Sequence, residues 1–173
     1  ANFQDTMGSA TPTGKMGRWQ AGKGWTLIPT GPVSGPNGVI LSTDEKKVFF
    51  ADWGGKGLVR MDLATQAIDR VNLGYLVDNI LWDSNRKYIL AGGQNGTVQE
   101  VFGGCAASKT KVNCDTPFSL VAVNPDTLEA KPIFGPGNLG PVGVGTGAMQ
   151  DGDYLWLTSF RADRLPRIPY PLK

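Results

Sequence analysis

The sequence contains no histidine, no long apolar run and only two cysteines among its 173 residues. Without histidine, the chain lacks the commonest general base and a common zinc ligand. No apolar run approaches the length needed to cross a bilayer. The net charge is +2, and the basic residues are scattered rather than gathered into a stripe. We therefore expect neither a membrane nor a nucleic acid as a partner.

Helical periodicity is also missing nearly throughout, whereas glycine and proline are abundant. The chain has 24 glycines and 12 prolines, a composition typical of many tight turns between short strands. Its length is that of one domain with a sizeable core. The sequence therefore predicts an all-β protein.

Comparing the chain with itself reveals repeats. Residues 48–63 align without a gap to residues 155–170, and residues 88–96 give a third copy of the first strand and its turn. The first interval of about 40 residues suits one four-stranded propeller blade. The longer second interval fits an insertion that contains the cysteines.

These repeats divide the chain into about three blades. We expect blades at 34–74, at 75–140 with the insertion, and at 141–173, while 1–33 would be the tail of a preceding blade. Apolar runs at 39–41 and 80–82 predict inner strands, and outer strands such as 119–123 are expected to be more amphipathic. Because an arc of three blades exposes apolar faces and sheet edges, we expect that it does not stand alone.

Cys105 and Cys114 lie close together in a polar stretch. A bridge between them would close a loop of about ten residues, for which chain entropy gives roughly 3 kcal/mol of stabilisation. The bridge, which we favour over two free thiols, implies a secreted or periplasmic protein. No signal peptide is visible in the first 30 residues.

Several stretches resemble the calcium-dependent lactonase propellers. They are residues 34–44, the Asp-Asn pair within 76–80, and residues 145–164. This superfamily groups gluconolactonase/SMP-30 proteins, paraoxonase/arylesterases and strictosidine-synthase-like proteins, and the Asp-Asn pair is most similar to the paraoxonase-like branch. Its members are six-bladed and roughly twice as long, so the resemblance implies the C-terminal half of a six-bladed β-propeller.

The resemblance implies that Asn37 and Asp78 are calcium ligands, with Asn79 a further one. In a propeller, the first residue of each innermost strand lies near one mouth of the channel, so such side-chain oxygens converge. Calcium prefers six to eight oxygen ligands. The remaining ligands would fall before residue 1, and residues 145–147 would supply no side-chain ligand. Alternatively, Asn37 belongs to a turn dipeptide that only starts a strand.

The implied activity is calcium-dependent hydrolysis of lactones or esters. The cation would polarise the carbonyl, and Asp78, the candidate catalytic carboxylate, would activate water or attack directly. Any histidine base must lie elsewhere, or the chemistry uses only carboxylate and metal. The alternatives are a binding or structural propeller with structural calcium, and a strictosidine-synthase-like enzyme.

The rest of the ring would come from a companion chain that carries the N-terminal half, or from a second copy with C2 symmetry. Other residues receive structural interpretations. We expect Asp52 to cap a turn, Arg161 and Arg164 to be solvated, and four aromatic residues to serve blade packing: Trp53, Trp82, Trp156 and Phe160.

Overall fold

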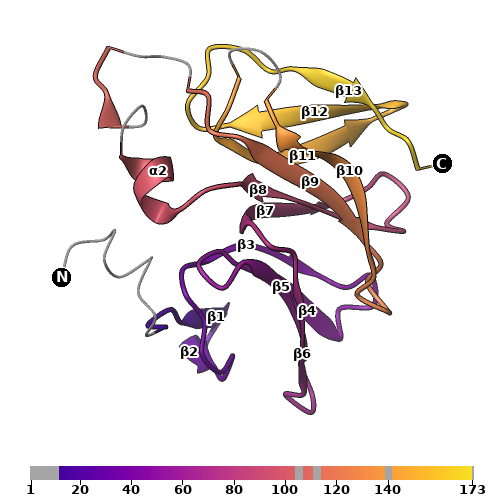
Figure 1. Cartoon of the computed structure of the whole chain (residues 1–173). Helices are drawn as coiled ribbons and strands as arrows, with labels where there is room; N and C mark the ends of the chain where they lie inside the picture. The colour runs from indigo at the N-terminus through magenta and orange to yellow at the C-terminus, as the bar shows by residue number, and fades with distance from the viewer. Residues whose placement is uncertain (1–11, 104–106, 111–113, 139–141, 173) are drawn as a thin grey trace.

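The computed structural model describes residues 12–103, 107–110, 114–138 and 142–172, which form successive antiparallel sheets (Figure 1). A hairpin comes first, made of β1 (Met16–Gln20) and β2 (Gly24–Ile28). The first four-stranded sheet follows in chain order, with β3 (Pro36–Leu41), β4 (Lys47–Asp52), β5 (Gly57–Asp62) and β6 (Ile68–Asn72).

The second four-stranded sheet repeats this order. It contains β7 (Leu76–Trp82), β8 (Ile89–Gln94), β9 (Phe118–Val123) and β10 (Ala130–Gly137). A short helix, α2 (Val98–Phe102), follows β8, and a capping box between Thr97 and Glu100 starts it. The third sheet has three strands in the described residues, β11 (Gly145–Asp151), β12 (Tyr154–Ser159) and β13 (Arg167–Pro169). None of the helices in the described part of the chain is long and apolar enough to span a membrane.

The middle strands of the two four-stranded sheets are buried on both faces. In β8, Ile89 and Ala91 belong to the core against the first sheet, whereas Leu90 belongs to the core against the third. Successive side chains of a strand point to opposite faces, so one short apolar run can serve two cores. This packing explains why the repeats at 48 and 88 read as continuous apolar runs, since they form β4 and β8, whereas the repeat at 155 forms β12, in which Leu155 and Leu157 are buried and Tyr154 is exposed.

The expectation that residues 119–123 form an amphipathic outer strand is wrong. Every residue of β9 is buried, because Val121 and Val123 pack toward the first sheet and Leu120 and Ala122 toward the third. Although β9 lies third from the inner edge, it is still sandwiched between two neighbouring sheets.

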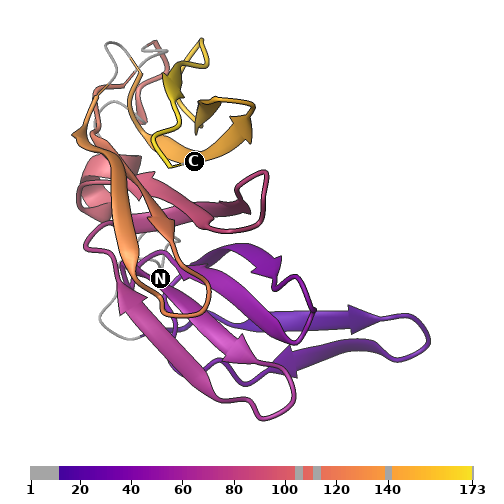
Figure 2. The ribbon, with the colours of Figure 1, turned by 90° about the vertical axis from the view of Figure 1, so that its right-hand side faces the viewer.

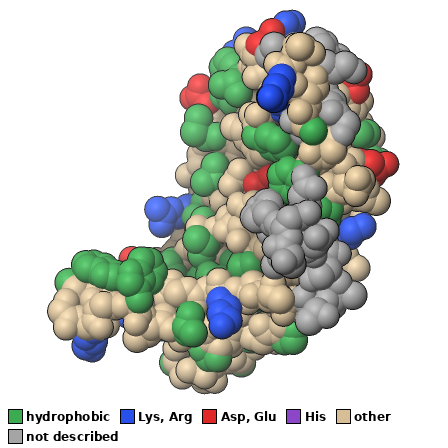
Figure 3. All heavy atoms as spheres, turned by 90° about the vertical axis from the view of Figure 1, so that its left-hand side faces the viewer, with side chains coloured by type: hydrophobic (Ala, Val, Ile, Leu, Met, Phe, Trp, Pro, Cys, Tyr) green, Lys and Arg blue, Asp and Glu red, His purple; other side chains and the backbone are tan. Residues whose placement is uncertain are grey.

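The sheets stack face to face into an open arc, from which the β1–β2 hairpin projects (Figures 1 and 2). One face of the hairpin contributes Met16 to a core with Val33, Phe50 and Val59. The opposite face is apolar and exposed, and Figure 3 shows hydrophobic side chains gathered on the projecting hairpin.

The predicted disulfide lies only partly in the described structure. Cys114 is buried beside Trp53, Leu76 and Val144. Cys105 lies outside the described residues, so the bridge between them stays a prediction.

Inner strands of neighbouring sheets approach so closely that a glycine is required. A Cβ atom added at Gly38 of β3 would lie 2.6 Å from the backbone nitrogen of Ile80 and 2.9 Å from Cα of Asn79, both in β7. Backbone atoms cannot rotate away as a flexible side chain can. Gly38 therefore sets the spacing between the first and second sheets.

Replacing Gly38 with alanine should destabilise the protein by about 1–3 kcal/mol, the usual range for overpacking a tight core. The matched control is Gly137→Ala in β10, because the nearest atom to a Cβ there is a Phe134 ring carbon at 3.6 Å. Urea unfolding of both variants measures the difference, and equal stabilities would contradict the close-approach argument.

Candidate functional site

The first strands of the three sheets lie next to one another. Strand β7 contacts both β3 and β11, and each of the three is the inner edge strand of its sheet. A polar residue at one end of these strands therefore meets its counterpart from a neighbouring sheet, as a propeller hub requires.

Each inner strand carries a register shift at the corresponding position near its start. In β3 the shift lies between Pro36 and Val39, and in β7 it lies between Val77 and Ile80. In β11 it lies between Gly145 and Gly147. Such β-bulges re-aim side chains and often occur beside functional sites. Asn37, Asp78, Asn79 and Thr146 all lie within these bulges.

The structure brings Asn37 and Asp78 together. The Asn37 side chain donates a hydrogen bond to the Asp78 carboxylate, although the two residues belong to different sheets. Asp78 is half-buried and Asn37 is exposed. Asn37 is the second residue of β3 and lies in its bulge, so it stands at the start of a strand, as the alternative expects, and also contacts Asp78.

Asn79 lies beside this pair and lines a groove along the inner strands. The groove has a volume of about 420 Å³, and its walls include Gly38, Thr146 and Gly147. The Thr146 hydroxyl is hydrogen bonded to that of Thr158 at 2.9 Å. Asn79 is exposed at this groove and directly follows Asp78 in the bulge of β7.

Sequence reasoning missed Gln94, which lies beside Asp78. The Gln94 side chain is fully buried, and its Nε2 donates to Asp78 Oδ2 at 2.8 Å and to the Gly145 carbonyl oxygen at 2.8 Å. Its Oε1 accepts from Trp53 Nε1, also at 2.8 Å. The available signal was a lone polar residue that ends the otherwise apolar strand β8. Trp53, expected to serve packing alone, is also part of this network.

Burial dominates the electrostatics of Asp78. Loss of solvent raises the pKa of its carboxyl above the usual value, and the hydrogen bonds from Gln94 and Asn37 only partly oppose this effect. Both donors are neutral amides. In the described part of the chain, none of the ion pairs involves Asp78.

The donor set at this end of the inner strands fits a hard cation. Asp78, Asn37 and Asn79 offer one carboxylate and two amide carbonyls, which are oxygen ligands of the kind that calcium prefers. The described residues contain no cluster of three histidine, cysteine, aspartate or glutamate side chains. These three residues would therefore supply only part of a calcium coordination sphere, because calcium takes six to eight oxygens.

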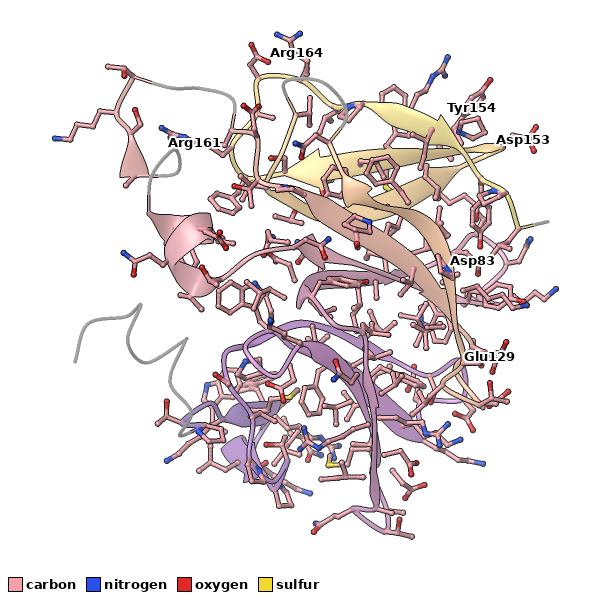
Figure 4. All side chains as sticks on the ribbon, in the orientation of Figure 1. Asp83, Glu129, Asp153, Tyr154, Arg161 and Arg164 are labelled. Carbon is pink, nitrogen blue, oxygen red and sulfur yellow. The ribbon has the colours of Figure 1, made fainter. Side chains whose placement is uncertain are left out.

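The structure gives Asp52 and Arg161 other surroundings than the sequence analysis expected. Asp52 accepts from the Ser34 amide at 2.7 Å and pairs with Arg70 at 3.3 Å, so it anchors the segment before β3. Arg161 is half-buried rather than solvated: it donates to the carbonyl oxygen of Ser108, and its Nε is buried without a partner in the described residues (Figure 4). Arg164 is exposed and pairs with Asp163.

No protein-family model matches the sequence, and no curated protein matches it either. Solved structures do match. One is a catalytically inactive virginiamycin B lyase from Staphylococcus aureus with quinupristin, with a TM-score of 0.55 and 13% identity. The match covers 92% of this chain and 50% of that one.

Two further structures are similar. A streptogramin B lyase has a TM-score of 0.54 at 16% identity, over 91% of this chain and 48% of that one. An oligogalacturonate lyase in complex with manganese has a TM-score of 0.51 at 17% identity. This match covers 83% of this chain and 42% of that one.

The chain thus spans about half the length of the solved structures it matches. At these identities the similarity shows the fold alone. Together with the sheet order, it confirms the prediction of an all-β chain that forms about three blades of a β-propeller.

The raised pKa of Asp78 can be tested by a carboxyl NMR titration in the presence of a chelator. Its midpoint should lie above the usual value, whereas that of Asp44 should lie below it, because Ser42 and the Lys46 amide donate to Asp44. A folded pKa above the unfolded one means that Asp78 stabilises the fold at low pH, and this contribution is lost as the pH rises through the folded pKa. An Asp78 midpoint at or below that of Asp44 would contradict the burial argument.

Proposed function

We propose that this chain is the C-terminal half of a six-bladed, calcium-dependent hydrolase of lactones or esters. The observation that carries the proposal is the meeting of Asn37 and Asp78 at the bulges of two adjacent inner strands. Their oxygens, with that of Asn79, would hold the cation, while further ligands come from outside this sequence. The resemblance to lactonase propellers supplies the substrate class.

The chemistry follows from these groups. A divalent cation bound there would polarise the substrate carbonyl and stabilise the oxyanion that forms. Asp78 would take the proton of the attacking water or attack the carbonyl carbon itself. Asn37 would hold the carboxylate toward the hub, and the groove beside Asn79 would receive part of the substrate.

Hydrolysis of simple lactones and aryl esters should require calcium and be lost when a chelator is added. Asp78→Asn should lower kcat by at least about 100-fold, because it removes the proposed base, and should abolish the calcium-induced rise in Tm. At 100 times Kd, calcium should stabilise the wild-type protein by about 2.7 kcal/mol. Calcium-dependent assays and thermal unfolding measure both effects.

The matched control is Asp83→Asn, directly after the other end of β7 (Figure 4). Asp83 is buried and accepts from Tyr170 and from the amides of Lys87 and Tyr88, so its loss should lower stability without changing the response to calcium. Calcium binding without activity in the complete ring would instead favour a binding or structural propeller.

A companion chain with the N-terminal half is the partner that we propose. Trp19, Trp25 and Leu27 are 59%, 74% and 71% exposed on one face of the hairpin, and among the described residues β1 pairs only with β2. At the other end of the arc, Met149 and Tyr154 are exposed. Inner strands and a neighbouring blade from the companion would cover these surfaces. The proposed Cys105–Cys114 bridge would place the assembly in a secreted or periplasmic setting.

Native mass spectrometry of the protein from its source should therefore find this chain bound to a second, non-identical polypeptide. Trp25 and Leu27 should be protected from surface labelling in that complex. A single repeated mass would favour the C2 homodimer and contradict the companion, as would one longer polypeptide that contains this sequence.

A further inference from the structure

A chain of hydrogen bonds reaches Asp78 from the neighbouring sheet. Trp53 follows β4 in the first sheet, and its indole N–H donates to Gln94 at the end of β8 in the second. Gln94 in turn donates to Asp78 in β7 and to the carbonyl of Gly145 in β11. Trp53 is 1% exposed and Gln94 0%, so water does not compete for these bonds. The network therefore connects all three sheets.

The chemistry of the indole fixes the orientation of the Gln94 amide. An indole nitrogen can only donate, so the amide oxygen of Gln94 must face Trp53. The amide nitrogen then faces Asp78 and Gly145, and both offer acceptors. A rotated amide would place its oxygen against these acceptors and leave the Trp53 donor buried without a partner, which is unfavourable.

We propose that Trp53 and Gln94 are positioning residues that hold the Asp78 carboxylate in its orientation toward the hub. Gln94 binds Oδ2 from β8, the strand on the outer side of β7, while Asn37 binds the carboxylate from the neighbouring sheet. Trp53 acts only through Gln94, because its N–H determines which way the amide faces. This inference rests on the proposed cation site, in which Asp78 is a ligand.

The chain offers a matched control in Trp82. Its indole N–H also donates between the first and second sheets, to the carbonyl oxygen of Leu41 at 2.9 Å. Leu41 and Trp82 end β3 and β7, so this bond lies away from the bulges that hold Asn37 and Asp78. The same substitution at Trp82 therefore removes an inter-sheet bond of the same donor, although a more exposed one, without touching Asp78.

The test is calorimetric titration of calcium into the assembled protein. In the wild type the ring centroids of Trp53 and Phe102 lie 5.6 Å apart, and Trp53→Phe keeps an aromatic ring there. The substitution removes the indole N–H donor, so it should weaken calcium binding about tenfold. Gln94→Met, which removes both donors to the oxygens, should weaken it by about 10- to 100-fold. Trp82→Phe should stay within about twofold of the wild type. Equal effects of Trp53→Phe and Trp82→Phe would overturn the proposal.

A second measurement follows Gln94 directly, without calcium. Hydrogen exchange of its side-chain amide, followed by NMR, should be slow in the wild type and in Trp82→Phe, and at least about tenfold faster in Trp53→Phe. Unchanged exchange in Trp53→Phe would overturn the positioning role of the indole. A wild-type protein that binds no calcium would refute the proposed function, and the exchange result alone would then decide whether Trp53 holds Gln94.

Discussion

The hydrogen bonds around the Asp78 carboxylate connect the three sheets at their inner strands. A half-buried carboxylate is unfavourable unless donors surround it, and here the donors come from outside its own strand. Asn37 reaches it from the first sheet, and Gln94 reaches it from β8 while also binding Gly145 of the third sheet. Satisfying one side chain therefore fixes the relative position of three sheets.

Close backbone approach makes this network possible. Gly38 allows β3 to lie against the backbone of β7, and a Cβ at Gly147 would lie 3.0 Å from Cβ of Asn79. Larger residues at these two positions would separate the inner strands and lengthen the bonds that span them. The glycine after Asn37 thus serves packing, whereas the asparagine serves the polar network.

The sequence was sufficient for the fold because its strongest signal was periodic. The apolar run at 88 is continuous for a physical reason: β8 is covered by the first sheet on one face and by the third on the other. The runs at 48 and 155 form β4 and β12, which hold the same place in their own sheets. The pairing of Asn37 with Asp78 followed from this repeat once the strands were assigned to a common hub.

Gln94 and the burial of Arg161 could not be predicted in the same way. Gln94 matters because three partners from separate parts of the chain converge on it, and no local pattern encodes that convergence. Arg161 was misjudged because a polar turn normally faces solvent, whereas here it packs against the segment that contains Ser108. The burial of β9 likewise depends on the neighbouring sheets rather than on its own residues.

The contrast between Asp78 and Asp83 separates a structural carboxylate from a functional candidate. Both belong to the same inner hairpin, and Figure 4 places Asp83 at the end opposite Arg161. The Asp83 carboxylate accepts hydrogen bonds from two amides of its own turn and from the Tyr170 hydroxyl, so both of its oxygens have donors within this chain. Asp78 has two neutral donors, and burial raises its pKa, so positive charge beside it would lower the free energy of the ionised form. This difference in environment, rather than carboxylate chemistry in general, is the physical reason to propose Asp78 as the candidate metal ligand.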